Sequence, residues 1–318
     1  MNVSAPQIAT DMVEVPFRVE QHHSGLRLDE FMMAMLPRYS RNQIHNIIET
    51  RLARKKGRNF KKSSRVRTGD EVFFLYLKRE ETVQDINIPV LYEDEHILVV
   101  NKPPDISVHS SNPWGKNDLI QQLKRQRDNN NLYLAHRIDR ETSGIILIAR
   151  SSIIARKLGE SFSGRDVEKE YTAIVFGEMA NDKGIIDLPI CRDERSPVKI
   201  KMTATQGKGA SSITEYSVIN RFNGFTLVNA RPKTGRQHQI RAHFAAIGHS
   251  LVGDKIYKDE RLFLLFIKDG FTEELKNELL LSRHALHASR LSFKHPVTEY
   301  SMNICVELPE DLRKFIKH

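Results

Sequence analysis

The sequence is poor in the features that define several large classes of protein. Only two of its 318 residues are cysteine, Cys191 and Cys305, which excludes a disulfide framework, and they lack the spacing of a metal site. No run approaches the roughly 20 apolar residues of a membrane span. The N-terminus contains acids and no long apolar stretch, so it does not resemble a signal peptide. These absences predict a reduced, soluble, cytoplasmic protein that does not enter a membrane.

Several standard catalytic motifs are also absent. The chain has no glycine-rich motif for nucleoside triphosphates or dinucleotides and no glycine–serine motif of a nucleophile elbow. Its 13 histidines are not spaced with acidic residues as metal ligands are. The sequence therefore argues against nucleotide-dependent, serine-hydrolase and zinc chemistry.

Positive charge, in contrast, is abundant. The chain contains 49 Lys and Arg against 40 Asp and Glu, a formal net charge of +9. Such an excess suggests a polyanionic partner, most often nucleic acid. The length suits two domains, one large and one small, and the hydrophobic content of 40% is enough for a core.

Composition divides the chain into four segments. We expect a flexible tail over residues 1–16, a compact unit over 17–79, a polar linker over 80–89 and a second domain over 90–318. In the compact unit, two amphipathic helices precede residues 51–67, where every charged residue is basic. This basic segment is predicted to contact RNA phosphates, although a solvated charge run is the alternative. The predicted contacts are Arg54, Lys55, Lys56, Lys61 and Lys62.

The compact unit resembles the alpha-L RNA-binding domain, which is also found in a small-subunit ribosomal protein. The matching residues are Gly25, Arg27-Leu28-Asp29, Ser40-Arg41, Ile44, Ile48 and Gly69-Asp70. Lys56-Gly57 stands where the family usually has an Asn-Gly turn. The resemblance implies a small α/β domain that binds RNA.

The second domain alternates predicted strands and helices. Strands are expected at 96–102, 145–149, 169–177, 212–222, 224–232, 286–295 and 297–308. Helices are expected at 117–127, 151–162, 271–281 and 309–316, with another that opens within 234–243 and ends at Gly248.

The stretch 136–144 is the most unusual part of this domain. Asp139 stands between Arg137 and Arg140, on a loop that leads into the apolar strand. On spacing alone, a surface ion-pair loop is the favoured interpretation. The alternative is chemistry by a single acid, with arginines and a strand tyrosine, such as nucleophilic attack at a sugar carbon. A glycosidase would usually need a second, matched carboxylate.

Residues 136–144, His-Arg-Ile-Asp-Arg-Glu-Thr-Ser-Gly, resemble the signature of the RluA-type pseudouridine synthases. Other segments match in order: Asn101-Lys102-Pro103, Lys169-Glu170-Tyr171, Thr234-Gly235-Arg236, His238-Gln239-Ile240-Arg241, Gly253-Asp254 with Tyr257, and His287-Ala288. Two departures are Ile138, where leucine is usual, and Asp105, where glycine is common.

The resemblance implies an α+β fold with a central mixed, largely antiparallel sheet flanked by helices. It implies an isomerase that converts uridine in RNA to pseudouridine without metal or organic cofactor. Asp139 would start cleavage of the glycosidic bond, Arg241 would pair with Asp139, and Tyr171 would stack on the base and could help remove the ring proton. Arg137 could fill the space of a flipped base. Further predicted substrate contacts are Arg140, Lys102, Arg236 and His238.

The expected substrate is large-subunit ribosomal RNA, with transfer RNA as the main alternative. Two rival functions are a non-catalytic RNA-binding assembly factor and a nucleoside or base glycosylase. We expect a monomer without an obligate protein partner.

Overall fold

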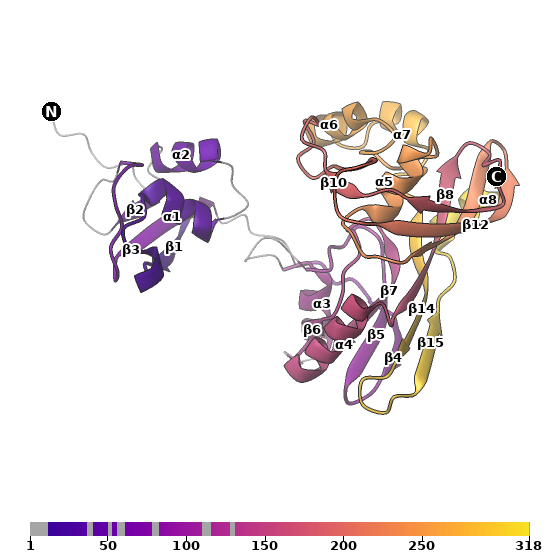
Figure 1. Cartoon of the computed structure of the whole chain (residues 1–318), viewed down its shortest axis with the longest axis horizontal. Helices are drawn as coiled ribbons and strands as arrows, with labels where there is room; N and C mark the ends of the chain where they lie inside the picture. The colour runs from indigo at the N-terminus through magenta and orange to yellow at the C-terminus, as the bar shows by residue number, and fades with distance from the viewer. Residues whose placement is uncertain are drawn as a thin grey trace. The chain divides into compact units, whose positions relative to one another are not determined.

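The computed structural model describes residues 12–36, 41–49, 53–55, 61–77, 83–109, 116–127 and 131–317. The chain forms two compact units, residues 1–81 and 82–318 (Figure 1). No helix in these described ranges is long and apolar enough to cross a membrane.

The first unit contains a three-stranded antiparallel sheet and two α-helices. Strands β1 (Met12–Arg18), β3 (Glu71–Leu77) and β2 (Ala53–Lys55) lie in that order. A 3₁₀ turn (Gln21–His23) and helices α1 (Leu28–Met35) and α2 (Arg41–Glu49) follow β1. The predicted tail, residues 1–16, was too long: residues 12–16 pair with β3, because the apolar alternation of β1 fits an antiparallel neighbour.

A buried cluster joins the helices of this unit to its sheet. Leu28 and Phe31 of α1 pack with Ile44 of α2 and with Val72 of β3. Asp29 is also fully buried and accepts hydrogen bonds from the Arg27 side chain at 2.9 Å and from His45 at 3.0 Å. These partners hold its pKa at about 2, because the hydrogen bond from Arg27 outweighs the effect of burial.

The second unit is built on a ten-stranded sheet. Its strands are β4 (Val90–Glu93), β5 (Ile97–Lys102), β6 (Tyr133–Leu134), β7 (Ser143–Ala149), β8 (Glu168–Phe176), β9 (Lys183–Asp187), β12 (Ile213–Phe222), β13 (Phe225–Pro232), β14 (Leu286–Lys294) and β15 (Ser301–Cys305). The order is β4-β5-β7-β14-β8-β13-β12-β9, with β6 beside β7 and β15 beside β14. Only β7 and β14 pair in parallel, so the predicted mixed, largely antiparallel sheet is confirmed. Strands β10 (Ile190–Arg192) and β11 (Met202–Ala204) form a separate pair.

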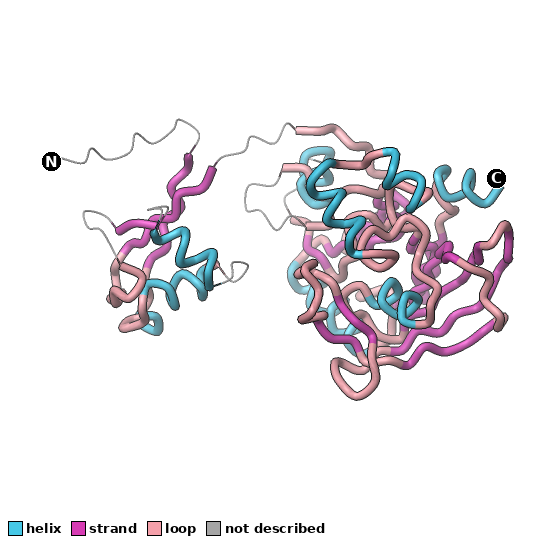
Figure 2. Tube along the Cα trace, turned by 90° about the horizontal axis from the view of Figure 1, so that it is seen from above, coloured by secondary structure: helices cyan, strands magenta, loops and turns pink. Residues whose placement is uncertain are grey.

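Helices cover both faces of this sheet (Figure 2). The helices are α3 (Leu119–Arg127), α4 (Ser152–Gly164), α5 (Gln239–Ala246), α6 (Glu260–Asp269), α7 (Glu273–Leu279) and α8 (Glu310–Lys317). Alternate residues of β5 and β7 point to opposite faces, so one set packs on α3 and the other on α4. Helix α5 packs against β8 and β13, and α8 packs on the opposite face of the same strands.

The contact between β7 and β14 requires a glycine. Gly144 has φ +112°, and a Cβ there would lie 2.3 Å from the Ala288 carbonyl oxygen. Only glycine allows this close approach without strain. The parallel pairing therefore begins immediately after the loop that carries Asp139.

Candidate active site

The loop before β7 is held by buried hydrogen bonds. Lys102 donates from Nζ to the carbonyl oxygens of Pro103, Ile106 and Arg140, at 2.8 to 2.9 Å. His136 accepts a 2.9 Å hydrogen bond at Nε2 from the Leu147 amide. Burial lowers the pKa of His136 to about 3, so the ring is neutral and able to accept. The backbone around Asp139 is therefore fixed from both sides.

Asp139 is paired with Arg241, as the family resemblance implied. Arg241 Nη1 lies 2.9 Å from Asp139 Oδ2, although the two residues are 102 positions apart. The same guanidinium donates to both oxygens of Asp254, at 2.6 and 2.9 Å. Asp254 is fully buried and also accepts from the amides of Ile256 and Tyr257. One buried arginine thus bridges a structural carboxylate and a partly exposed one.

This arrangement keeps Asp139 ionised. Burial alone would raise the pKa of its carboxyl group, but the charge and hydrogen bond of Arg241, together with the charges of His238 and His284, outweigh that effect and lower the pKa to about 2. Asp254 and Asp139 in turn raise the pKa of Arg241 against the opposing effect of burial. With 27% of its side chain exposed, Asp139 remains a charged carboxylate that a ligand can reach.

His238 also lies near the carboxylate of Asp139. It has φ +55° at the start of α5, and its Nε2 is 3.9 Å from Asp139 Oδ2. Its Nδ1 is 3.1 Å from the Tyr257 hydroxyl, which also accepts from the Met202 amide. Burial lowers the pKa of His238 to about 4, so the ring is neutral at pH 7. It can orient a ligand by hydrogen bonding without adding charge.

A second buried network holds the residue Glu141. Its carboxylate lies 2.8 Å from Lys255 Nζ and accepts a 3.0 Å hydrogen bond from the His284 amide. Thr142 Oγ1 lies 2.7 Å from His284 Nε2. These contacts fix the chain just after Asp139 to the segments 254–257 and 283–287.

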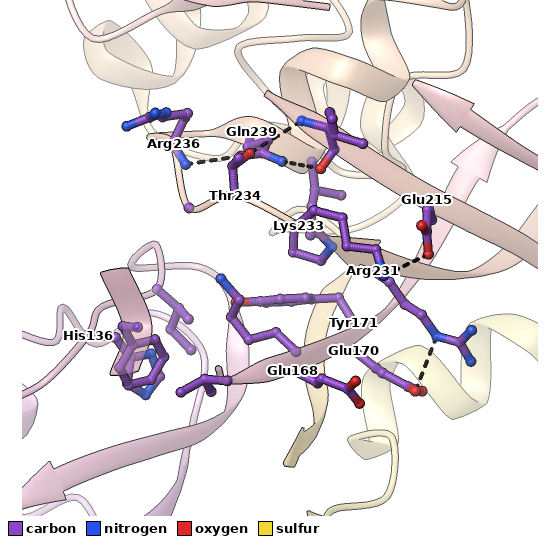
Figure 3. Close-up of a pocket in the computed structure, with 18 of the residues that line it drawn as sticks. His136, Glu168, Glu170, Tyr171, Glu215, Arg231, Lys233, Thr234, Arg236 and Gln239 are labelled. Atoms are coloured by element: carbon purple, nitrogen blue, oxygen red, sulfur yellow. Dashed lines mark hydrogen bonds and ion pairs between the residues drawn. The ribbon is translucent and has the colours of Figure 1, made fainter. Parts of the chain in front are cut away.

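Asp139 opens onto a cavity of about 1220 Å³. Figure 3 shows several lining residues, including Tyr171 of β8 and Arg236 in the turn before α5. The lining includes seven Lys and Arg against five Asp and Glu, so its net charge is positive. Burial raises the pKa of Tyr171, and the charge of Asp139 adds to the rise, so its phenol is protonated at neutral pH. The volume and charge suit a polyanionic chain rather than a small neutral molecule.

The predicted substrate contacts divide into two groups. Arg137, Arg236 and His238 line the cavity together with the three predicted catalytic residues. Lys102 and Arg140 do not line it. Lys102 is 0% exposed with three carbonyl partners, so its position contradicts direct contact with RNA. Arg140 is exposed, but its Nε donates to the Asp105 carbonyl outside the cavity, which does not favour the predicted contact either.

The predicted contacts of the basic segment lie in the first unit. Lys61 and Lys62 are exposed, and Lys62 Nζ lies 3.1 Å from Glu49 Oε1. The backbone of Arg54 and Lys55 forms part of β2. Lys56 lies outside the described residues.

Several residues of the site had no role assigned to them from the sequence. Asp254 and Tyr257 belonged to a matched motif, and nothing in their spacing showed that they contact Arg241 and His238. Glu141 was given no role from the sequence, and its carboxylate pairs with Lys255. The contact between Glu141 and Lys255 joins residues 114 positions apart, whereas those of Asp254 and Tyr257 span 13 and 19 positions, and only the motif match offered a signal for any of them.

The site combines an ionised carboxylate paired with a buried arginine, a cavity of net positive charge and a protonated tyrosine. These features suit an enzyme that acts on a polyanion by nucleophilic or general-base chemistry. Comparison with known proteins is more specific. Residues 96–246 match the family model of RNA pseudouridylate synthase. The chain is 33% identical over 315 residues to ribosomal large subunit pseudouridine synthase D of Blochmanniella floridana, covering 95% of this chain and 97% of that protein.

A second relative and a solved structure agree. The chain is 34% identical over 304 residues to ribosomal large subunit pseudouridine synthase D of Xanthomonas campestris, covering 92% of this chain and 88% of that protein. The structure of human RNA pseudouridylate synthase domain containing 1 matches with a TM-score of 0.59 and 25% identity, over 73% of this chain and 89% of that one. The chain belongs to the RNA pseudouridine synthase family. It is an isomerase that converts uridine to pseudouridine.

Proposed function

We propose that this enzyme modifies uridines of large-subunit ribosomal RNA, with Asp139 as its catalytic residue. The observation that carries the catalytic assignment is the 2.9 Å contact between Asp139 and Arg241 at the open end of a buried Arg241–Asp254 pair. The substrate assignment rests on relatives that are named as large-subunit synthases and that align with nearly the whole chain.

In the proposed reaction, the carboxylate of Asp139 starts cleavage of the bond between the base and the ribose. The detached base rotates and rejoins the ribose through a ring carbon; that carbon then loses its proton, and the ring nitrogen freed from the ribose gains one, so that the product is an isomer of the substrate. The target nucleotide must leave the helical stack before any of these atoms can be reached. A pKa of about 2 ensures that Asp139 is available as an anion at neutral pH.

Tyr171 and Arg137 serve the base in this proposal. Tyr171 lines the cavity with Asp139 and can stack on the detached base. Its raised pKa favours stacking over proton removal, because the phenolate that would act as a base is scarce at neutral pH. Arg137 is exposed in the same cavity and can take the place that the flipped base leaves.

The first unit supplies further affinity in this proposal. Its exposed lysines suit contacts with phosphates, which position RNA without reading its sequence. Transfer RNA remains the alternative substrate, and a non-catalytic assembly factor the alternative function. We further propose that the enzyme acts as a monomer in the cytoplasm.

The central test uses RNA that carries tritium on the ring carbon that forms the new bond. Wild-type enzyme should release tritium from large-subunit ribosomal RNA, whereas Asp139→Ala should bind the RNA and release none. Free uracil as the product would indicate a glycosylase. Release from transfer RNA alone would refute the substrate assignment, and turnover by Asp139→Ala would refute the catalytic one.

The target is best identified in cells. Pseudouridines of ribosomal and transfer RNA should be mapped with and without the gene for this chain. The proposal expects the loss of sites in large-subunit RNA and their return with the wild-type gene but not with the Asp139→Ala gene. Loss of sites only in transfer RNA would contradict it.

A further inference from the structure

Three of the seven cations that line the cavity have an acidic partner in the described part of the chain, namely Arg231, Lys233 and Arg241. Arg231 lies 3.1 Å from Glu170, and Lys233 lies 2.9 Å from Glu215, both shown as dashed lines in Figure 3. Lys169 is different. No ion pair or hydrogen bond from the described part of the chain holds its ammonium group, although the residue is partly buried and lines the cavity.

The position of Lys169 directs this ammonium toward a ligand. Lys169 stands two residues before Tyr171 on β8, and alternate side chains of a strand share one face. A Cβ added to Gly235 would lie 3.7 Å from Lys169 Nζ. The ammonium therefore reaches from β8 to the turn before α5, on the same side of the strand as Tyr171. Because Gly235 has no side chain, space remains around the ammonium of Lys169.

An unpaired ammonium in this position is costly. Burial lowers the pKa of Lys169, which shows that its charge is poorly solvated in the free protein. Such a group is stabilised when a ligand supplies negative charge. A base carbonyl is only a neutral acceptor, whereas the phosphate diester that joins two nucleotides is an anion and forms stronger, charge-assisted hydrogen bonds.

A second free cation stands on the same wall. Arg165 ends α4 in the left-handed conformation, lines the cavity and is exposed. Like Lys169, it has no ion pair within the described ranges. Two unpaired cations at one end of β8 fit a strand of RNA better than a single anionic group, because phosphates recur along the strand.

We propose that Lys169 binds a phosphate diester directly adjacent to the target uridine and so fixes the nucleotide over Tyr171. The proposal rests on the proposed function, because it needs an RNA strand in the cavity. Lys169 is a substrate-binding residue in this scheme, and it takes no part in bond cleavage.

The test compares the salt dependence of RNA binding. The probe is an oligonucleotide of large-subunit RNA that contains a uridine modified by the wild-type enzyme. Lys169→Met should lower the slope of log K against log salt by about 0.7, the value for one phosphate contact with single-stranded RNA. Lys169→Arg should retain the wild-type slope. Lys276→Met is the control, because Lys276 lies on α7 beside Glu273 and does not line the cavity.

A chemical change in the RNA supplies an independent measurement. Methylphosphonates, which are uncharged, would replace in turn the phosphate on each side of the uridine. Wild-type enzyme should bind one of the two neutralised RNAs more weakly than the unmodified RNA. Lys169→Met should bind that neutralised RNA and the unmodified RNA with the same affinity. Lys169→Gln would replace the methionine variant if the latter does not fold.

Two outcomes overturn the proposal. The first is a salt slope for Lys169→Met equal to that of the wild type. The second is a loss of affinity with each methylphosphonate RNA that is the same for the wild type and for Lys169→Met. Tritium release by the wild-type enzyme from the same oligonucleotide keeps the two questions separate. If the wild type turns over the RNA while Lys169→Met keeps the full slope, the phosphate site fails and the proposed function stands.

Discussion

Replacing Arg241 should change the pH dependence of the reaction in a specific direction. In the wild-type enzyme the pKa of Asp139 is about 2, compared with 3.8 for the free side chain. This difference corresponds to about 2.5 kcal/mol in favour of the carboxylate. Burial is the largest single effect on this pKa and acts in the opposite direction; the charge of Arg241 is the largest of the effects that together offset burial and produce the net fall.

Arg241→Met retains much of the side-chain volume and removes the charge. With burial no longer offset by Arg241, the pKa of Asp139 should rise above 3.8, and the fraction of enzyme with a carboxylate should fall as the pH falls through the new value. The assay is the single-turnover rate of tritium release at saturating RNA from pH 4.5 to 8. Wild type should show no acid limb from Asp139 in this range, whereas the variant should lose rate toward its lower end.

Two further variants separate charge from packing. Asp254→Asn should lower the rate, because Arg241 would lose a negative charge and one of the two oxygens that orient it, at 2.6 and 2.9 Å. Arg290→Met removes an arginine that contacts Asn303 far along β14 and should leave the profile unchanged. If Arg241→Met keeps a rate that is independent of pH down to 4.5, Arg241 does not set the protonation of Asp139 and this reasoning is wrong.

Gly144→Ala should lower the free energy of unfolding by roughly 3 kcal/mol or more in urea, because its Cβ would meet the Ala288 backbone at 2.3 Å; a loss below 1 kcal/mol would show that β7 and β14 can separate. Glu141→Gln and Lys255→Met should each lower kcat with little change in the Kd for RNA, and the double variant should lose less than the sum. Strictly additive losses would mean that the pair does not act as a unit. Replacing the four lysines of the basic segment with glutamine should weaken RNA binding and reduce its salt slope by roughly 3, and an unchanged slope would exclude phosphate contacts there.

The long elements of the second domain could be predicted from local pattern. Strand β7 is a continuous apolar run, and β12 and β13 flank an Asn-Gly turn. The short strands β10 and β11 and the helix α6 were not predicted. Each of these strands has three residues and too little alternation to be recognised, and their pairing depends on partners elsewhere in the chain.

The start of helix α5 illustrates a different limit. The sequence predicted a helix that opens within residues 234–243, but α5 begins at Gln239, and His238 precedes it with φ +55°. Gln239 Oε1 accepts from Thr234 Oγ1 and from the Arg236 amide, which stabilises a turn where a helix was expected. His238 and Arg241 nevertheless both approach Asp139, at 3.9 and 2.9 Å. Helical spacing does not account for this arrangement, because only Arg241 lies within the helix.

The candidate site itself could not be assembled from spacing. A surface ion-pair loop was the favoured interpretation of residues 136–144, because Arg137 and Arg140 are the sequence neighbours of Asp139. In the structure neither of them neutralises it, and the arginine that does is 102 residues away. The resemblance to a family supplied this partner, whereas composition and periodicity did not.

Two consecutive residues connect the fold to the chemistry. Asp254 holds Arg241, which holds Asp139, while Lys255 holds Glu141. The side chains of adjacent residues point in different directions. Asp254 therefore acts on Asp139 through Arg241, while Lys255 contacts Glu141, two residues further along the catalytic loop. Gly253 makes this possible, since a Cβ there would lie 1.9 Å from a backbone oxygen of the neighbouring segment. Asp139 is therefore oriented through its charge partner and through its own backbone at once, and a change at either contact should affect the rate before it affects RNA binding.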